Sequence, residues 1–470
     1  MIHSHRFSLD QFAPIAVYEK LKGLFLGEIS FLLESAGNSN GNYTIIALGA
    51  RERLRYSDGQ THYTNSKNEI ITSTESPFEF LKRYYSAIDC GFYRSKAKEL
   101  DIGYIDGFIG YIGYDMVQVF EPTLKESMST LEDQTHIPDM DLILPKLVAV
   151  VSHKYSTITL ISALSEYQDQ FLTLERTLKS LYHYTPLVPI KNDLGGDFIH
   201  TKSHFFEMID ASKEMIQSGD VFQILMTNRY IRNATVDPYS FYRVLRIKNP
   251  SPYMYLMEYG DFSIVGSSPE VMVRLNEGDI LLRPIAGTRK RGGSKQRDTQ
   301  LEEELLSDPK ELAEHLMLID LGRNDVGRVA ATGTVRVEEM MHVERYSHVM
   351  HIVSDVHATL RDDKDMFDLL AATFTAGTMT GAPKIRSMEL IAQLEGVKRG
   401  FYSGTIGYFG FDGNMDSAIT IRTALIKDGQ IILQAGAGIV ADSVHELEYL
   451  EVTNKLGALT STLEDLIDPA

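Results

Sequence analysis

Runs of apolar residues in the second half of the chain predict a succession of β-strands. Alternating or continuous apolar runs bounded by turn residues suit pleated surfaces that are half or fully buried. The expected strands cover residues 262–267, 271–275, 280–284, 334–337, 352–360, 404–411, 418–427 and 430–435. Asp428 and Gly429 separate the last two runs, and Asp-Gly readily adopts the positive φ angles of a two-residue hairpin turn. These two strands are therefore predicted to be antiparallel neighbours.

Segments with a helical spacing of apolar residues interrupt these strands. The expected helices cover residues 207–218, 310–321, 365–373, 385–394 and 446–456. The first part of the chain repeats the strand pattern more weakly, at residues 43–49, 146–151 and 157–162. Consecutive strands with separate helices indicate an α+β fold, in which large antiparallel sheets are covered by helices.

One segment has the character of a linker. Residues 182–201 contain two prolines and a Gly-Gly pair, and they show no regular apolar period. The chain is therefore expected to divide into an N-terminal region, 1–190, and a C-terminal region, 191–470.

Composition narrows the class of protein further. The chain has 46 Lys and Arg residues against 64 Asp and Glu residues, a formal charge of -18, which argues against a broad nucleic-acid-binding surface. Its single cysteine, Cys90, excludes an internal disulfide and a Cys-rich zinc site. The N-terminus lacks the long apolar core of a signal peptide, and the longest apolar stretches, such as residues 107–120, fall short of a membrane span. We therefore expect a cytoplasmic protein without nucleic-acid or membrane partners.

Two predicted helices carry paired glutamates. Glu311 and Glu314 lie three residues apart, as do Glu448 and Glu451, so each pair shares one helix face. If the two faces meet, their carboxylates supply the hard oxygen ligands that suit Mg²⁺. The spacing alone equally fits ordinary solvated faces. Lys455, four residues after Glu451, fits either a surface ion pair or an ammonium group directed at an anionic substrate.

Two glycine-rich segments follow predicted strands. QAGAGI at 434–439 leaves backbone N–H groups able to approach an anion closely, although a bulge or tight turn explains the glycines equally well. TAGTMTGAPK at 375–384 precedes a helix expected to start at Ala382-Pro383. That helix start fits a carboxylate-binding site or a capped loop.

Together these segments resemble the chorismate-utilising enzymes. The matching motifs occur in the family's order: GSSPE (266–270), RPIAGTRKRG (283–292), ELAEHLMLIDLGRNDVGRV (311–329), VERYSHVMHIV (343–353), AGTMTGAPKIRSMELI (376–391), GTIGYFGFDGNMDSAITIRT (404–423) and AGAGIVADSVHELEYLEVTNK (435–455). The first part matches less densely, through LLES (32–35) and GFIGYIGYDMV (107–117). The resemblance implies large antiparallel sheets packed in a sandwich and covered by helices.

The resemblance also implies a metal site and two catalytic residues. Glu314 and Glu451 match the pair that binds Mg²⁺ beside the ring carboxylate of chorismate, with Glu311 and Glu448 acting through water. Glu270 matches the general acid that protonates the departing C4 hydroxyl, a role that needs a raised pKa.

His351 matches a histidine implicated in the same site, and a hydrogen-bonded structural role explains it equally well. Further positions match substrate contacts. By resemblance, the substrate-binding residues are Thr288, Thr378, Arg422, Gly436, Ala437, Gly438 and Lys455.

Single positions help to separate the branches of the family. Isochorismate and salicylate synthases have a lysine base where this chain has Gln223, which cannot act as a base. Many aminodeoxychorismate synthases have a nucleophilic lysine where this chain has Ala286. Alanine is typical of the anthranilate-forming branch, and some aminodeoxychorismate synthases are thought to share it.

A second feature of the anthranilate-forming branch is an allosteric tryptophan site, built around LLES and NPSPYM segments. Both occur here, the second at 249–254. The expected tryptophan-site residues are Glu34, Ser35, Pro252, Tyr253 and Met254, with a buried carboxylate receiving the amino group. A structural loop, or a permanently held tryptophan, explains the same segments.

The resemblance therefore implies Mg²⁺-dependent conversion of chorismate and ammonia to anthranilate and pyruvate. The alternative product is aminodeoxychorismate. The ammonia would come from a separate glutamine amidotransferase subunit in a hetero-oligomer, because Cys90 lies in no Gly-x-Cys-x-Gly elbow. A different class, a non-catalytic relative that binds tryptophan or chorismate, is disfavoured because Glu270, Glu314, Glu451 and Arg422 are all present.

Overall fold

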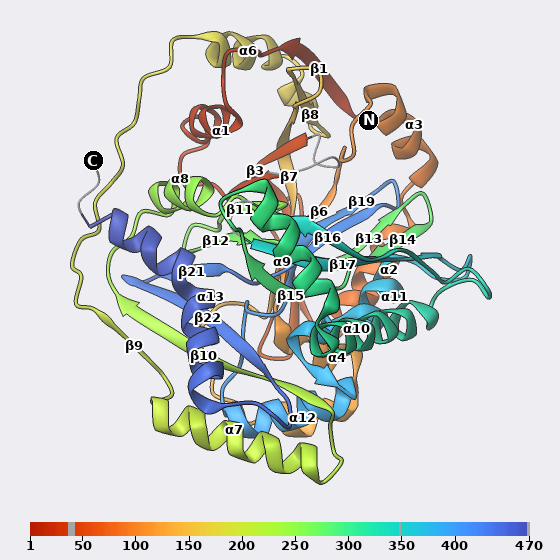
Figure 1. The fold of residues 1–470 in the computed structure, drawn as a ribbon. Coiled ribbons are helices and arrows are strands. Elements are labelled where there is room, and N and C mark those ends of the chain that lie inside the picture. The colour runs from red at the N-terminus through yellow and green to blue at the C-terminus, as the bar shows by residue number, and fades with distance from the viewer. Residues whose placement is uncertain (36–42, 347–348, 468–470) are drawn as a thin grey trace.

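The computed structural model describes residues 1–35, 43–346 and 349–467 (Figure 1). Every pair of named strands in these ranges is antiparallel. The strands form one connected network around two long members, β3 (Tyr43–Ser57) and β7 (Met140–Ser152), which pair with each other. A register shift between Ala50 and Glu52 marks a bulge, which bends β3 so that its two halves serve different arms of the network.

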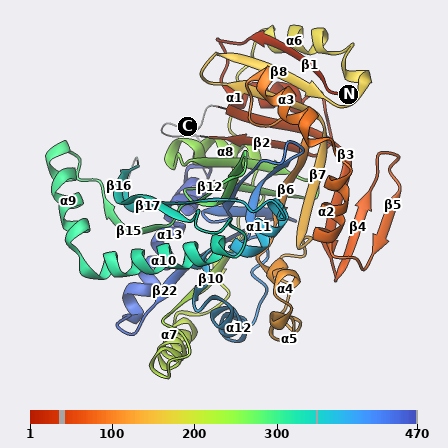
Figure 2. The ribbon, with the colours of Figure 1, turned by 90° about the vertical axis from the view of Figure 1, so that its right-hand side faces the viewer.

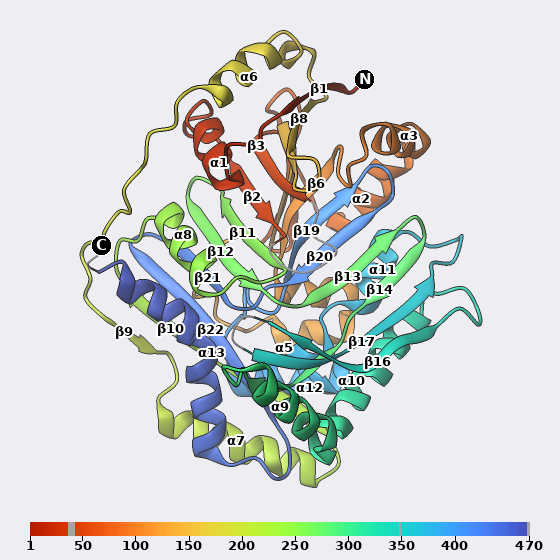
Figure 3. The same cartoon turned by 45° about the horizontal axis from the view of Figure 1, so that its top comes forward.

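The first arm continues from the first half of β3 into the C-terminal region (Figure 3). In spatial order it contains β2 (Ser30–Glu34), β11 (Tyr253–Glu258), β12 (Phe262–Ser268), β21 (Thr423–Lys427), β22 (Gln430–Ile439), β10 (Gln223–Asn233) and β9 (Gly196–Phe198). The short β18 (Gly381–Ala382) pairs with the start of β10. Beyond β7 the same arm ends in β8 (Thr157–Ser162) and β1 (His3–Ser8).

The second arm continues from the first half of β7. In spatial order it contains β6 (Gly107–Ile112), β19 (Thr405–Gly410), β20 (Met415–Ile419), β13 (Val271–Asn276), β14 (Asp279–Leu282) and β17 (Val349–Thr359). The last of these, β17, also pairs with β15 (Ile285–Lys290) and β16 (Arg336–Arg345). On its other side the arm ends in β4 (Gln60–Thr64) and β5 (Ile70–Ser73), which lie beyond β3 in Figure 2.

The two arms share an apolar core, as expected for a sandwich. Phe31 and Met257 of the first arm belong to the same buried cluster as Ile406 of the second arm. Their sequence neighbours Leu32 and Leu256 point to the opposite face, because side chains alternate along a strand, and they join a second cluster beneath helices. The first arm is therefore buried on both faces, and the predicted α+β sandwich is confirmed.

Helices cover the outer faces. The second cluster includes residues of α1 (Pro14–Lys22), α6 (Phe171–Lys179), α7 (Lys202–Gln217), α8 (Pro238–Lys248) and α13 (His445–Asp465). The first cluster includes residues of α2 (Pro77–Ser86), α4 (Val117–Phe120), α5 (Lys125–Met128), α10 (Pro309–Gly327) and α11 (Met366–Thr373), and α12 (Lys384–Glu395) contributes to both. The remaining helices are α3 (Cys90–Leu100) and α9 (Lys295–Ser307). None of the helices in the described ranges combines the length and apolar character that crossing a membrane requires.

The predicted helices are all present, but one predicted strand is wrong. Residues 418–427 form parts of two strands, β20 and β21, because the chain turns at Arg422, where φ is 50°. The predicted hairpin is confirmed: Asp428 and Gly429 have φ angles of 49° and 74°, and β21 pairs with β22. The strand expected at 334–337 begins at Arg336 and runs on to Arg345.

The linker expected at 182–201 is largely extended. Residues 181–190 contain no helix or strand, and the segment passes along the outside of the ribbon between α6 and β9 (Figure 1). Strands from either side of it nevertheless pair directly, β2 with β11 and β6 with β19. The two predicted regions therefore share their sheets, and the boundary at residue 190 stays a prediction.

Candidate active site

Glu270 lies at the turn between β12 and β13, where its side chain is buried. Its backbone carbonyl accepts a hydrogen bond from the Ile419 amide at 3.0 Å, and its Oε1 accepts one from Thr378 Oγ1 at 3.0 Å. Burial raises the pKa of Glu270 to about 7, although the Thr378 hydrogen bond and the positive charges of Lys455 and Arg422 act against the rise. A carboxyl group with this pKa is substantially protonated at neutral pH, as a general acid must be.

Arg422 occupies the turn between β20 and β21. Its carbonyl accepts a hydrogen bond from Ser267 N at 3.1 Å, but no hydrogen bond or ion pair of its guanidinium occurs within the described ranges. Burial lowers its pKa, while the negative charge of Glu270 acts in the opposite direction. A cation withdrawn from water without a partner is costly, so this group offers a strong binding site for a carboxylate.

His351 lies on β17, opposite Thr288 on β15. Its Nδ1 is 2.9 Å from the Gly287 carbonyl oxygen and 3.1 Å from Thr288 Oγ1. Because a carbonyl oxygen can only accept, Nδ1 carries the proton and Nε2 is left as an acceptor. Burial lowers the pKa of His351 to about 4, so the ring is neutral at physiological pH. Its position therefore combines a structural hydrogen bond at Nδ1 with an Nε2 that has no hydrogen-bond partner among the described residues.

The predicted acidic residues gather from two helices. α10 begins after the N-cap Asp308 with Pro309 in its first turn, and it packs against β15, whereas α13 packs against β22 (Figure 1). Burial raises the pKa of Glu314, and the negative charges of Glu311 and Glu451 raise it further. Glu314 is thus close enough to both for their charges to act on it.

The four carboxylates differ in how they are compensated. Glu311 accepts a hydrogen bond from Arg289 at 3.0 Å, and Glu451 forms a 2.7 Å ion pair with Lys455. Glu314 has no hydrogen-bond or ion-pair partner in the described part of the chain. The fourth, Glu448, has its pKa raised by burial.

The number and type of these carboxylates determine whether they can hold Mg²⁺. Within residues 1–35, 43–346 and 349–467, no three or more acidic, His or Cys side chains converge on one metal position. Mg²⁺ usually takes only one or two carboxylates from a protein, with substrate oxygens and waters completing its shell. Glu314 and Glu451 supply two carboxylates from two helices, and the mutual repulsion at Glu314 is the field that a cation relieves. The residues fit this ion.

The predicted Gly436–Gly438 segment is a continuous part of β22, not a bulge or turn. Gly436, Ala437 and Gly438 lie opposite residues of β10, and a Cβ on Gly438 would approach Gln223 Nε2 to 2.6 Å. Lys455 Nζ donates to the Gly436 carbonyl at 2.8 Å, so this carbonyl faces away from β10. The amide of a strand residue points to the same side as its carbonyl. The Gly436 amide is therefore directed toward Lys455.

Two tyrosines near this site were missed by the sequence reasoning. The Tyr346 ring packs edge-on against His351, with centroids 5.6 Å apart, and its hydroxyl donates to Glu344 at 2.8 Å. Tyr402 is fully buried. Burial is the main cause of its raised pKa, and the negative charges of Glu395 and, to a smaller extent, Glu270 add to the rise. Tyr346 lies inside the 343–353 motif, so its place in that motif could have marked it as a site residue. Residues 347–348 of the motif lie outside the described ranges.

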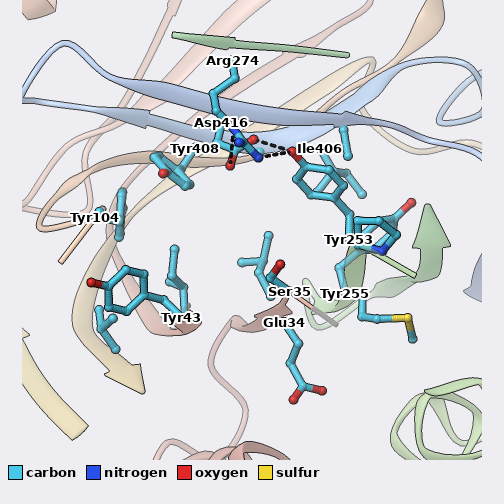
Figure 4. Close-up of a pocket in the computed structure, with 18 residues that line it drawn as sticks. Glu34, Ser35, Tyr43, Tyr104, Tyr253, Tyr255, Arg274, Ile406, Tyr408 and Asp416 are labelled. Atoms are coloured by element: carbon cyan, nitrogen blue, oxygen red, sulfur yellow. Dashed lines mark hydrogen bonds and ion pairs between the residues drawn. The ribbon is translucent and has the colours of Figure 1, made fainter. Parts of the chain in front are cut away.

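The five predicted tryptophan-site residues line one cavity of about 120 Å³ (Figure 4). We name it the tyrosine-lined cavity, because Tyr43, Tyr104, Tyr253, Tyr255 and Tyr408 surround it. Its walls come from both predicted regions of the chain. The predicted residues lining it are Glu34, Ser35, Pro252, Tyr253 and Met254.

One expectation about this cavity is wrong. The Glu34 carboxylate does not face the centre of the cavity in Figure 4 but points away from it. It accepts hydrogen bonds from Tyr242 at 2.6 Å and from Arg246 at 2.7 Å, so it is already neutralised. The reason is strand alternation: in β2, Glu34 faces the side of α8 whereas its neighbours face the cavity.

The opposite wall carries the cavity's charged groups. Tyr253 donates to Asp416 Oδ1 at 2.7 Å, and Arg274 donates to the Tyr253 hydroxyl at 2.9 Å. Arg274 also lies 3.2 Å from Asp416 Oδ2. Sequence reasoning missed Arg274 and Asp416, because they come from β13 and β20, far from the two motifs.

Comparison with known proteins identifies the family. Residues 29–461 match the family described as chorismate binding enzyme. The chain is similar to anthranilate synthase component 1 of Aquifex aeolicus (strain VF5), with 40% identity over 97% of this chain and 93% of that protein. It is also similar to the component 1 of Acinetobacter calcoaceticus, with 41% identity over 97% and 93% of the two chains.

Solved structures agree. The crystal structure of anthranilate synthase component I from Streptococcus pneumoniae TIGR4 superimposes with a TM-score of 0.78 at 33% identity, covering 97% of this chain and 99% of that one. The menaquinone-specific isochorismate synthase from Escherichia coli shares the fold, with a TM-score of 0.72 over 98% of this chain and 94% of that chain at 20% identity. The chain belongs to the chorismate binding enzymes. Within this family, the Aquifex aeolicus, Acinetobacter calcoaceticus and Streptococcus pneumoniae relatives are named anthranilate synthases.

Proposed function

We propose that this chain converts chorismate and ammonia to anthranilate and pyruvate, the first step of tryptophan biosynthesis. The observation that carries the proposal is the buried Glu270, whose pKa burial raises to about 7, near the Arg422 guanidinium, which has no hydrogen-bond or ion-pair partner among the described residues. A protein that only binds chorismate has no use for a carboxyl group held ready to donate a proton. The names of the similar proteins support anthranilate as the product.

Substrate binding relies on charged side chains and backbone donors. Arg422 forms a bidentate contact with one substrate carboxylate, and the Gly436–Gly438 backbone amides and Lys455 add further donors. Thr288 and Thr378 supply hydroxyl contacts. Folding has already removed water from the Arg422 guanidinium. A substrate carboxylate that binds there supplies the missing partner, so little further desolvation of the guanidinium opposes binding.

The chemistry proceeds in two stages. In the first, ammonia adds at C2, Glu270 protonates the C4 hydroxyl, the C4–O bond breaks and water leaves. In the second, the C2 proton is lost and the enolpyruvyl side chain departs as pyruvate, giving the aromatic ring. The unprotonated Nε2 of His351 is an acceptor for a proton or hydrogen bond in this stage, and burial keeps it from being protonated beforehand.

Mg²⁺ would be held by Glu314 and Glu451, with Glu311 and Glu448 contributing through water. When bound, the ion polarises the ring carboxylate and assists departure of the hydroxyl. Arg289 and Lys455, which contact Glu311 and Glu451, orient these carboxylates.

The ammonia is proposed to come from a glutamine amidotransferase subunit in a hetero-oligomer. The single Cys90 does not suit glutamine hydrolysis, because burial raises the pKa of its thiol and a nucleophilic cysteine needs the thiolate. The designation of the relatives as component 1 supports a second component. A cytoplasmic location, inferred from the cysteine content, stays a prediction.

The test is a reaction of the purified chain with chorismate, Mg²⁺ and an ammonium salt. Fluorescent anthranilate is the expected product, and glutamine in place of ammonium should give none. Accumulation of aminodeoxychorismate would replace the proposal with the alternative branch. Chorismate binding without turnover would identify a non-catalytic relative.

We further propose that the tyrosine-lined cavity binds tryptophan as an inhibitor. The tyrosines and Met254 offer an apolar surface for an indole ring, and the Arg274–Asp416 pair offers opposite charges to the carboxylate and ammonium groups of an amino acid. An inhibition curve with added tryptophan tests this proposal. A rate that is unchanged at millimolar tryptophan would contradict it.

A further inference from the structure

A buried ion pair lies behind the active site. Glu395 is the last residue of α12, and Arg399 follows it in the segment that leads to β19. Their side chains are only 2% and 1% exposed. Arg399 Nε donates to Glu395 Oε2 at 2.9 Å, and Nη2 donates to Oε1 at 2.7 Å. Desolvation offsets much of the attraction in such a pair, so its contribution to stability alone is a weak reason for its presence.

The remaining donors of Arg399 hold backbone next to the general acid. Nη1 donates to the Met379 carbonyl at 2.7 Å, and Nη2 also donates to the Leu225 carbonyl at 2.9 Å. Met379 ends the 3-10 turn η4 (Gly377–Met379), which carries Thr378 and lacks a side-chain N-cap. Arg399 therefore anchors the turn that presents the Thr378 hydroxyl to Glu270.

Glu395 extends the same connection to the opposite wall of the site. Its Oε1 accepts hydrogen bonds from the Thr227 amide at 2.9 Å and from Thr227 Oγ1 at 2.8 Å. Thr227 lies opposite Gly436 in the β10–β22 ladder, and the Gly436 carbonyl accepts from Lys455. One buried pair thus links the turn beside the general acid with the strand that carries the predicted substrate amides.

The N-terminal region supports the pair from behind. The Arg399 guanidinium lies over the Tyr114 ring, 4.8 Å from its centroid, and the Gly400 amide donates to Asp115 Oδ2 at 2.7 Å. Tyr114 and Asp115 belong to the 107–117 motif, to which the proposed reaction gives no role. Tyr114 and Asp115 thus contact Arg399 and the residue after it, whereas residues 107–112 of the motif form β6 between β7 and β19.

We propose that Arg399 is a positioning residue: with Glu395, it fixes the Gly377–Met379 turn so that Thr378 donates its hydrogen bond to Glu270. This inference rests on the proposed function and assigns it a residue that touches no substrate. Arginine suits the task because its planar fork reaches Glu395, Met379 and Leu225 at once, whereas a lysine ammonium cannot.

The test is a double-mutant cycle with Arg399→Lys and Thr378→Val, with anthranilate formation measured across pH. Arg399→Lys should lower kcat by about 100-fold, as expected for misplacement of a catalytic contact by roughly 1 Å. The Thr378 hydrogen bond lowers the pKa of Glu270, so its loss raises that pKa. The alkaline limb of kcat/KM should therefore move to higher pH in both single variants, and the double variant should be little worse than Thr378→Val alone.

A matched control separates positioning from folding. Arg53 forms a bidentate pair with the fully buried Asp141, at 2.8 and 2.5 Å, on strands away from the site. Arg53→Lys should lower the melting temperature without moving the pH profile. If Arg399→Lys only lowers stability in the same way, or if its loss multiplies with that of Thr378→Val, the inference is wrong.

Glu395→Gln keeps the shape of the pair and provides a second route if Arg399→Lys does not fold. The same upward shift of the alkaline limb is expected, and an unshifted limb in an active, folded variant contradicts the inference. Wild-type protein is assayed in parallel. Absence of anthranilate there overturns the proposed function, whereas an active wild type with an unshifted Arg399→Lys profile overturns the positioning role alone.

Discussion

Arg422 in the active site and Arg274 in the tyrosine-lined cavity are both largely buried arginines near an acidic residue, but their surroundings differ. Arg274 is 3.2 Å from Asp416 and donates to the Tyr253 hydroxyl, and its pKa is raised mainly by the charge of Asp416. Arg422 makes no such contact within the described ranges, and burial lowers its pKa.

The contrast separates two ways of using buried charge. In the cavity, the charge of Arg274 is compensated by Asp416. The candidate active site instead holds the Arg422 guanidinium and the Glu270 and Glu314 carboxyl groups, whose pKa values are shifted mainly because burial removes them from water. Within the described ranges, Arg422 therefore lacks the acidic partner that Arg274 has in Asp416.

The largest expected effect comes from removing the proton donor. Glu270→Gln keeps the shape of the side chain and the approach of Thr378 but cannot donate a proton to the C4 hydroxyl. We expect anthranilate formation to fall by about 1,000-fold, within the range of general acid catalysis. Steady-state fluorescence assays measure the rate, and thermal unfolding checks the fold. Near-normal turnover would remove Glu270 from the mechanism.

The next largest effect concerns the metal. Glu314→Gln should lower Mg²⁺-dependent turnover by roughly 100-fold while leaving the fold intact, because one of the two ion ligands is lost. Chelation of Mg²⁺ from the wild-type protein should stop turnover in the same way. Glu303→Gln, on the exposed face of α9, is the matched control and should behave as wild type. A variant Glu314→Gln that needs no more Mg²⁺ than wild type would contradict the assignment.

The pH profile sharpens the comparison without a mutation. Glu270 is active when protonated, so kcat/KM should fall as pH rises through about 7. His351 is proposed to act as the neutral ring, so its own protonation should lower kcat/KM only near pH 4. Glu314 must be ionised to bind Mg²⁺ and its pKa is raised, so it also contributes to the fall on the acid side. Above the alkaline limb the expected loss is about tenfold per pH unit. Measured at a constant concentration of free NH3, a flat profile between pH 6 and about 9 would exclude this protonation scheme.

The smallest effect is expected at the cavity. Asp416→Asn removes one charge of the neutralised pair and leaves Arg274 partly compensated by Tyr253 alone. We expect the tryptophan concentration for half-inhibition to rise about tenfold, equivalent to the loss of one charged hydrogen bond. Inhibition curves of wild type and variant measure the ratio, and an unchanged curve would place the ligand elsewhere.

The sequence predicted those parts of the site that depend on local spacing. The Glu311–Glu314 and Glu448–Glu451 pairs follow from helical periodicity, and Glu270, Thr378 and His351 came from motifs. The turn at Arg422 was missed because a non-glycine residue with positive φ leaves no local signal in the sequence.

The direction in which side chains point and the depth at which they are buried were harder to predict from the sequence. Glu34 was placed at the cavity correctly, but its carboxylate faces Arg246, because the register of β2 fixes which face each side chain occupies. The i, i+4 spacing of Glu395 and Arg399 in the sequence is also that of ordinary surface ion pairs. The pair is buried because β10, η4 and the 107–117 motif pack around it. These segments are distant from one another in sequence, so the sequence near Glu395 and Arg399 does not reveal the burial.

The sharing of β3 and β7 between the two arms has a practical consequence for truncation. A polypeptide that starts at residue 191 would leave β11 without β2 and β19 without β6. It would expose two bare strand edges at once, each a template for aggregation. Fragments cut at the extended segment should therefore be soluble only when both are produced together, so that each repairs the open sheets of the other.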